Sequence, residues 1–163
     1  MNADGSGQIN LTNHPGFDAD PAWSPDGKSL AFASWRGGVG FHVYTMELKS
    51  GQVAKLTSSP NRVGQVFPAW SPDGKWIVYG DFIGGVELFR CNPKGGNRKQ
   101  LTKLSQYNTQ AAWSPDGKKI AFAHFEVNEP GQLYLMNADG SEAEPLSESG
   151  NPCRLDGITW QPR

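Results

Sequence analysis

Three histidines are the side chains of this sequence best suited to bind a metal or transfer a proton near neutral pH. His14, His42 and His124 lie far apart in the chain, and no pair has a metal-ligand spacing such as His-x-x-x-His. The sequence contains no Gly-x-Ser-x-Gly nucleophile motif. The glycine-rich segment 36–40 lacks the strand-to-helix setting in which backbone amides hold phosphate. We therefore expect no catalytic residues, no metal and no cofactor.

Aromatic side chains beside arginines, carboxylates and amides offer a different chemistry, the recognition of a protein, peptide or carbohydrate. These residues gather in segments that differ between otherwise similar repeats, where binding loops on a rigid scaffold are normally found. We expect a binding surface made of Trp35, Arg36, Arg62, Gln65, Asp81, Phe82, Tyr107, Asn108, His124, Phe125, Arg154 and Asp156, with Asp18 and Asp20 near a central channel. The alternative is that Trp35, Phe82 and Phe125 only cover neighbouring strands.

A repeated motif must build the elements that position these residues. Trp-Ser-Pro-Asp-Gly-Lys occurs at 23–28, 70–75 and 113–118, and a shortened form, Trp-Gln-Pro-Arg, occurs at 160–163. Proline fixes φ at the first corner of a turn, and Asp-Gly tolerates the backbone angles that follow. The motif thus predicts a tight turn between two antiparallel strands. The short apolar run after each copy is typical of a strand covered on both faces.

A second landmark gives the period of the repeat. Leu-Thr occurs at 11–12, 56–57 and 101–102, and Leu-Ser at 146–147, so the spacing is 45 residues each time. A third strand, followed by a turn, fits between the two landmarks. Four short strands in each period are typical of a β-propeller blade. A β-sandwich is the alternative, but sandwiches do not keep a fixed period of this length.

We therefore expect an all-β chain without helices that forms a single partial β-propeller domain over residues 1–163. Closed propellers have about four to eight blades, so three blades leave strand edges and sheet faces uncovered. We expect a second copy, in a homodimer, or the rest of a longer parent chain to complete the ring. The expected parts are complete blades at 17–57, 64–102 and 108–147, a single outer strand at 8–12 and a single inner strand at 157–161.

The tryptophans and aspartates of the repeated motif are expected to be structural. A residue that recurs at one place in every repeat serves the repeat, so we expect the indoles to pack in the core and to donate to nearby acceptors. The aspartates are expected to accept backbone hydrogen bonds within the turns, and a calcium site is the weaker alternative. These residues are Trp23, Trp70, Trp113 and Trp160, and Asp26, Asp73 and Asp116.

These motifs carry a resemblance to a known family. Pro-Ala-Trp-Ser-Pro-Asp-Gly-Lys, then Leu/Ile-Ala-Phe-Ala, Tyr-x-Met-Asn-Ala-Asp-Gly-Ser and Leu-Thr, resembles the repeat of the TolB-like β-propellers, and it runs through the whole chain. The resemblance implies a ring of usually six blades, a periplasmic or extracytoplasmic location and a non-catalytic scaffold that binds protein partners. Similar repeats occur in prolyl-oligopeptidase-like peptidases and in oligogalacturonate lyases. The lyases use a histidine cluster on a metal, and this sequence has no such cluster.

Two rival functions stay open beside the binding scaffold: a structural unit that assembles with itself, and a metal-dependent carbohydrate-active enzyme. The 15 basic and 16 acidic side chains balance, which argues against a surface that binds nucleic acid and against a polybasic surface that contacts a membrane. No apolar run is long enough to cross a bilayer. Met-Asn-Ala-Asp-Gly-Ser at 1–6 recurs at 136–141, so we expect the chain to begin within a blade, without a signal peptide.

Overall fold

The computed structural model describes residues 1–58, 64–146 and 157–160. Twelve β-strands and no α-helix occur in these ranges, so the prediction of an all-β chain is confirmed. No helix able to cross a membrane is found in this part of the chain. The strands are β1 (Asp18–Trp23), β2 (Ser29–Ser34), β3 (His42–Glu47), β4 (Val53–Lys55), β5 (Gln65–Trp70), β6 (Ile77–Phe82), β7 (Val86–Cys91), β8 (Lys99–Gln100), β9 (Tyr107–Trp113), β10 (Lys119–Phe125), β11 (Gln132–Asn137) and β12 (Glu144–Pro145).

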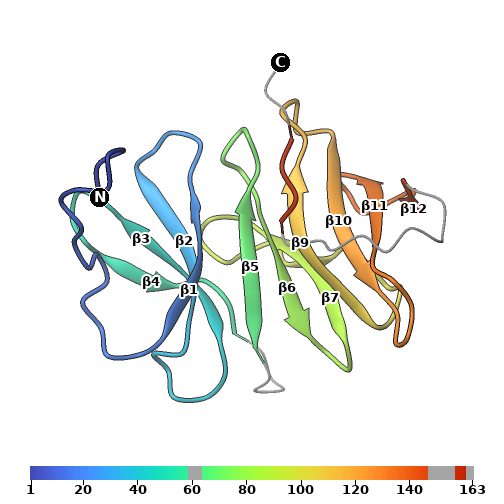
Figure 1. Cartoon of the computed structure of the whole chain (residues 1–163), viewed down its shortest axis with the longest axis horizontal. Helices are drawn as coiled ribbons and strands as arrows, with labels where there is room; N and C mark the ends of the chain where they lie inside the picture. Colours follow the sequence, from blue (N-terminus) through green and yellow to red (C-terminus); the bar gives the residue numbers. More distant parts are fainter. Residues whose placement is uncertain (59–63, 147–156, 161–163) are drawn as a thin grey trace.

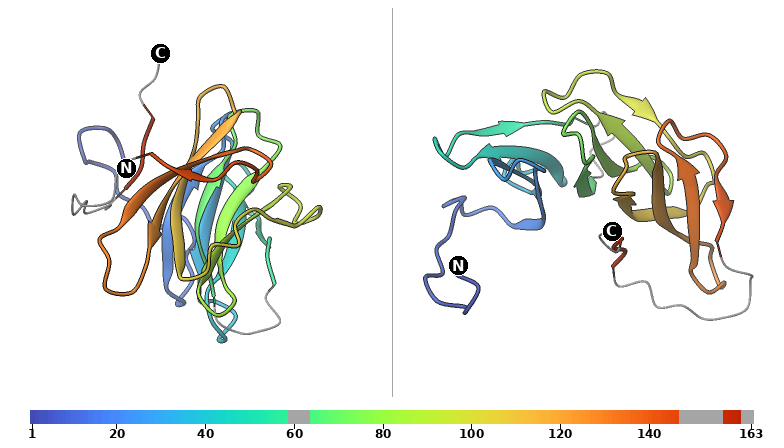
Figure 2. Two further views of the ribbon diagram at one scale, coloured as in Figure 1. Left: turned by 90° about the vertical axis from the view of Figure 1, so that its right-hand side faces the viewer. Right: turned by 90° about the horizontal axis from the view of Figure 1, so that it is seen from above.

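The strands form three sets of four, in which consecutive strands pair antiparallel. We call them unit 1 (β1 to β4), unit 2 (β5 to β8) and unit 3 (β9 to β12). Unit 1 is a separate sheet, whereas one parallel bridge between Val86 and Tyr107 joins units 2 and 3. Figures 1 and 2 show the units side by side in an open arc, with β1, β5 and β9 toward the inside and β4, β8 and β12 outside.

The Ser-Pro-Asp-Gly turns form as the motif predicts. In the first copy, Ser24 Oγ donates to Asp26 Oδ1 at 2.7 Å, and Asp26 Oδ1 accepts from the Lys28 amide at 3.1 Å. Gly27 takes a φ of 68°, which side chains disfavour. The other two copies repeat both side-chain contacts. The predicted role of the turn aspartates as acceptors of backbone hydrogen bonds is therefore confirmed.

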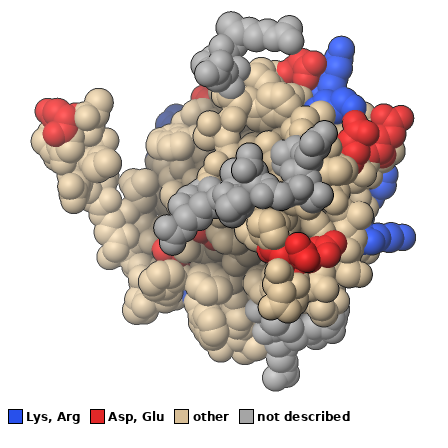
Figure 3. Space-filling view, turned by 45° about the vertical axis from the view of Figure 1, so that its right-hand side comes forward, with Lys and Arg blue, Asp and Glu red and all other residues tan. Residues whose placement is uncertain are grey.

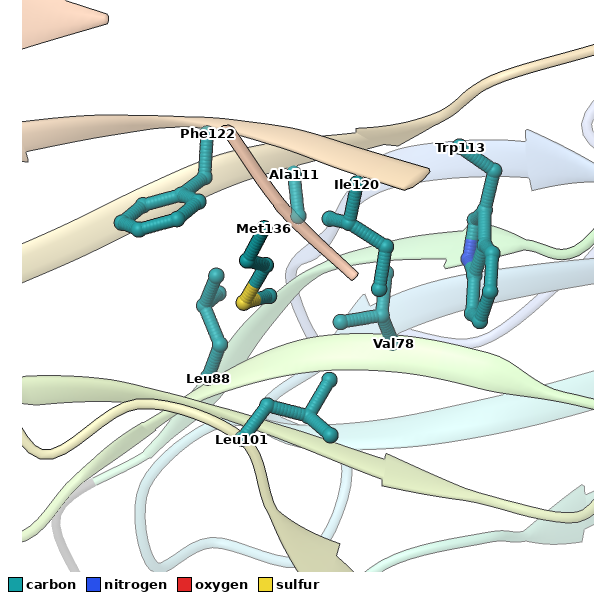
Figure 4. Packing of buried hydrophobic residues seen from close by; sticks show 8 residues of the cluster. All are labelled: Val78, Leu88, Leu101, Ala111, Trp113, Ile120, Phe122 and Met136. Carbon is teal, nitrogen blue, oxygen red and sulfur yellow. The ribbon is translucent and has the colours of Figure 1, made fainter. Parts of the chain in front are cut away.

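The hydrophobic core lies between the units. Figure 4 shows the cluster that joins units 2 and 3, in which Val78, Leu88 and Leu101 of unit 2 face Ile120 and Phe122 of unit 3. A second cluster joins units 1 and 2 and includes Ala31, Val43, Leu56, Ile77, Tyr79 and Phe89. Each of these middle strands is apolar on both faces because each sheet packs against a neighbouring sheet.

The tryptophans of the motif reach toward the preceding unit. Trp113 donates from Nε1 to the Ala69 carbonyl at 3.2 Å, and Trp160 donates to the Ala112 carbonyl at 3.1 Å. Trp113 is 8% exposed, but Trp23 is 61% exposed. The prediction that every motif tryptophan is a core residue is therefore wrong for Trp23, and the predicted nearby acceptor is missing for Trp70, whose buried Nε1 has no hydrogen-bond partner among the described residues. The exposure of Trp23 has a simple cause. The physical reason is that an indole packs against the unit before its own, and no described unit comes before unit 1.

The two single strands expected at the ends of the chain are not confirmed. Residues 8–12 and 157–160 are not assigned to any strand, and residue 161 lies outside the described residues. On the face drawn in Figure 3, basic and acidic side chains lie close together. The described atoms of this face therefore do not form the continuous basic surface typical of nucleic-acid binding.

Candidate functional site at the loop end

The two ends of the strands differ in character. At one end, which we call the turn end, lie the tight turns that connect the first strand to the second and the third to the fourth. At the other end, the loop end, lie the connections between second and third strands and between units, which vary in length from unit to unit. The loop end comprises residues 35–41, 83–85, 103–106 and 126–131, as traced in Figure 1. Loops held on a rigid scaffold are the usual place for binding residues.

The structure divides the predicted binding residues into exposed and buried groups. Trp35 and Tyr107 are about half exposed, and Arg36, Phe82 and Phe125 are partly buried. The buried group is Gln65, Asp81, Asn108 and His124. Arg62, Arg154 and Asp156 lie outside the described residues. The residues that are half exposed or partly buried can thus be reached by a partner, whereas the buried group lies within the scaffold.

Three aromatic rings form a cluster at the loop end of unit 1. Phe41 lies between Phe17 and Trp35, with ring centroids 6.0 Å and 5.3 Å away, in edge-to-face arrangements. Phe17 is 69% and Trp35 48% exposed. The Trp35 amide donates to the Phe17 carbonyl at 2.9 Å, and the Gln65 amide donates to the Phe41 carbonyl at 2.8 Å. We call these three residues the aromatic cluster; the backbone of Phe41 is hydrogen-bonded to unit 2, and the exposed rings of Phe17 and Trp35 pack against Phe41.

The buried residues Gln65 and Asp81 belong to a polar network between units 1 and 2. Gln65 Oε1 accepts from the Thr57 hydroxyl at 2.7 Å and lies 2.8 Å from His42 Nδ1. Gln65 Nε2 donates to Asp81 Oδ2 at 3.1 Å, which fixes the orientation of the amide. Because an amide oxygen only accepts, His42 carries its proton on Nδ1. Thr57 Oγ1 also accepts from the Val43 amide, so the network ties the connecting loop to β3.

An equivalent network joins units 2 and 3. Asn108 Nδ2 donates to Glu87 Oε2 at 3.1 Å, and Asn108 Oδ1 lies 2.8 Å from His124 Nδ1. The Thr102 hydroxyl donates to the Glu87 carboxylate and accepts from the Leu88 amide. Asn108 and His124 therefore take the places that Gln65 and Asp81 take in the first network. These side chains hold the loop end together.

Arg36 and Arg98 cover stacked aromatic pairs. The Arg36 guanidinium lies 5.0 Å from the ring centroids of Phe32 and Tyr44 and forms a 3.0 Å ion pair with Asp18. Burial alone would raise the pKa of Asp18, but hydrogen bonds and the Arg36 charge lower it overall. Arg36 is thereby held against unit 1.

Arg98 does the same in unit 2. It lies 3.8 Å from the Phe89 centroid and pairs with Asp81 at 2.8 Å. Sequence reasoning missed Arg98, Phe17 and Phe41, because their roles depend on contacts between distant segments. The pattern that could have predicted the contact is an aromatic residue at each end of the loop 35–41, namely Trp35 and Phe41.

Metal ligands do not gather in the described ranges 1–58, 64–146 and 157–160, where no group of three His, Cys, Asp or Glu side chains is arranged to hold an ion. The alternative of a metal-dependent carbohydrate-active enzyme thus has no supporting cluster in that part of the chain. The loop end therefore combines exposed aromatic rings with a buried, hydrogen-bonded polar framework.

Comparison with known proteins adds the family to this geometry. A family model described as the TolB beta propeller domain matches residues 1–81. The structure of a putative TolB from Agrobacterium tumefaciens superimposes with a TM-score of 0.74 at 28% identity, over 84% of this chain and 51% of that one. The chain is a TolB-like β-propeller repeat protein.

Two further relatives show how much of the longer proteins this TolB-like chain covers. TolB from Acinetobacter baumannii has a TM-score of 0.68 at 26% identity, over 88% of this chain and 34% of that one. An uncharacterized peptidase, YuxL, from Bacillus subtilis (strain 168) is 39% identical over 59 residues, 36% of this chain and 9% of that protein. The chain thus spans about half of the first TolB structure and less of the other two proteins.

Proposed function

We propose that the chain is a non-catalytic scaffold that binds a protein or peptide partner at its loop end. The observation that carries the proposal is the aromatic cluster, because exposed Phe17 and Trp35 are fixed in place before a partner arrives. Rigid, exposed aromatic side chains are the anchors that dominate many protein interfaces. The TolB relatives support a binding scaffold of this kind.

The proposed contact surface extends from the aromatic cluster to units 2 and 3. Tyr107 is the exposed aromatic residue next along the loop end, and Phe82 and Phe125 take the place of Trp35 in their own units. Aromatic faces also stack on sugar rings, so a carbohydrate is the alternative ligand. We further propose that units 1 to 3 are propeller blades spanning 17–57, 64–102 and 108–147, in a periplasmic or extracytoplasmic protein.

Peptide selection tests this function even though the partner is unidentified. The full chain is immobilised and used to select peptides from a random phage-displayed library, and the affinity of the recovered peptides is measured by calorimetry. We expect Trp35→Ala to weaken binding at least tenfold, as loss of an aromatic anchor does. Trp23→Ala is the matched control, because it removes another exposed tryptophan, 61% against 48% exposed, away from the loop end. Equal losses in both variants would contradict the proposal.

Self-association is the second candidate, and the open face of unit 1 favours it. Trp23 is exposed there, next to a hollow of about 180 Å³ lined mostly by apolar side chains, among them Leu30, Phe32 and Met46. A second copy of the chain that covers this face would form a dimer and bury the indole. Sedimentation velocity over a range of concentrations tests this. We expect Trp23→Ala to weaken the dimer and Trp35→Ala to leave it intact, and a chain that stays monomeric throughout would rule this candidate out.

A further inference from the structure

The first strand of each unit carries the same backbone irregularity on the inside of the arc. Asp20, Phe67 and Gln110 have φ values of 51°, 54° and 53°. In each unit the pairing between first and second strands shifts at this point. Positive φ is unfavourable for residues with side chains, most of all for a bulky one such as Phe67. A bulge of this kind redirects the side chain that it carries.

These three redirected side chains line one cavity of about 370 Å³, which we call the inner cavity. Asp20 comes from β1, Phe67 from β5 and Gln110 from β9, the strands that Figure 2 shows inside the arc. Pro21, Pro68, Ala111, Gly157 and Ile158 complete its wall. The backbone is alike in the three units while the side chains are an acid, an aromatic ring and an amide. The repeat therefore accounts for the three bulges. It does not account for the three different side chains at Asp20, Phe67 and Gln110.

The polar groups of the inner cavity are short of partners. The Asp20 carboxylate accepts a 3.3 Å hydrogen bond from the Phe67 amide. Burial raises the pKa of Asp20, although this hydrogen bond opposes the shift. Gln110 Oε1 is buried and has no hydrogen-bond partner among the described residues. A buried acceptor without a donor costs free energy, and a turn of the Gln110 amide toward the cavity would let a ligand that donates hydrogen bonds recover it.

We propose that the inner cavity binds an alkylammonium group, such as a lysine side chain of a peptide, with its charge at Asp20 and its aliphatic stem along Phe67 and Pro68. An ammonium group donates hydrogen bonds and supplies a positive charge to pair with the negative charge of the Asp20 carboxylate. A calcium ion fits poorly, because it takes six to eight oxygen ligands and this wall offers few oxygens beside its apolar groups. The inner cavity shares no residue with the aromatic cluster, so the proposal for each can be disproved without affecting the other.

Two small probes with the same stem test the charge requirement. N-acetyl-lysine methylamide and N-acetyl-norleucine methylamide are titrated into the full chain, and the backbone amide resonance of Phe67 is followed by NMR, because this amide contacts Asp20. We expect the lysine probe to bind about tenfold more tightly than the norleucine probe, the gain expected of one partly buried charge pair. Equal affinities, or a response to calcium chloride alone and not to the lysine probe, would overturn the proposal.

Matched variants locate the site. Asp20→Asn is expected to reduce the affinity for the lysine probe to that of the norleucine probe, and Gln110→Leu to reduce it several-fold. Glu129→Gln removes the same charge from an exposed position on the loop end and is expected to change the affinity less than twofold. Circular dichroism confirms that each variant is folded. Equal losses in the Asp20 and Glu129 variants would show a general charge effect and would overturn the proposal.

Discussion

Single residues at the loop end and in the inner cavity differ in polarity and in exposure to solvent. The loop end exposes apolar rings, whereas the inner cavity keeps a carboxylate and an amide oxygen partly out of water. Exposed rings are stabilised when a partner covers them, and a partly buried carboxylate is stabilised when a cation pairs with it. The two surfaces therefore favour different parts of a partner. Substitutions at single positions separate them.

Asp20→Asn is expected to stabilise the unbound chain at neutral pH. Burial raises the pKa of Asp20 above the ordinary value of 3.8, so the charged form favours unfolding. We expect the gain in the free energy of unfolding to be small, below about 1 kcal/mol, since solvent screens a group that is only partly buried. The gain should disappear below about pH 4, where the carboxyl is protonated in both states. Urea titrations across this range measure it, and a loss of stability at neutral pH would be the opposite result.

Cys91 is expected to be unreactive in the folded chain. It is buried in β7, and burial raises the pKa of its thiol to about 12, so the thiolate is scarce at neutral pH. Iodoacetamide labelling followed by peptide mass mapping should leave Cys91 unmodified in buffer and modify it in denaturant. Labelling of Cys91 in buffer as fast as in denaturant would contradict its burial.

Elements are joined by polar networks that repeat from unit to unit. Thr57 and Thr102 are the threonines of the Leu-Thr landmark, and each connects a loop to the third strand of its own unit. In these two copies of the landmark the hydroxyl also bonds a side chain at the junction with the next unit, Gln65 for Thr57 and Glu87 for Thr102. Buried hydrogen-bonded networks are costly to break one partner at a time.

Thr102→Val is expected to destabilise the chain by about 1–3 kcal/mol, because it removes the acceptor of the Leu88 amide and one of the three hydrogen bonds to the Glu87 carboxylate, which keeps those from Ser105 and Asn108. Thr102→Ser keeps the hydroxyl and should cost clearly less. Chemical denaturation of the two variants gives the comparison. Equal costs would show that the methyl group, and not the network, makes Thr102 important.

The fold was predictable from the sequence where contacts are local. The turn at 24–28 and the period of 45 residues depend on neighbouring residues and on spacing, and they predicted the strands of the three units but not the ends of the chain, where the two expected single strands are not confirmed. Gln65 and His124 were predicted as surface residues because they lie next to loops. Their burial depends on partners from another strand or unit, such as Thr57 and Asn108, which no local pattern reveals. The bulge at Phe67 was missed for the same reason.

The whole molecule is an open arc in which each unit packs against the unit before it. Trp113 packs against unit 2, whereas Trp23 lies on the open face of unit 1. The same side chain is thus a core residue in one unit and a surface residue in another. Whatever covers the open face, a second copy or more of a longer chain, would change the surroundings of Trp23.

The matched pair Trp113→Phe and Trp23→Phe measures this difference. We expect Trp113→Phe to cost about 1–3 kcal/mol, since it removes buried contacts and the hydrogen bond to the Ala69 carbonyl. Trp23→Phe should change the stability of the monomer by less than about 0.5 kcal/mol, as exposed substitutions usually do. Thermal or urea unfolding at a low protein concentration reports both values. A similar cost at the two positions would indicate that Trp23 is also covered.

Hydrogen exchange of the full chain, with and without a peptide recovered by the phage selection, tests the central claim that the loop end is the binding surface. We expect the bound peptide to slow exchange in the loop-end segments 35–41 and 103–106. The turn-end segments 25–28, 72–75 and 115–118 should exchange as before. Protection confined to the turn end or to the open face of unit 1 would contradict the account.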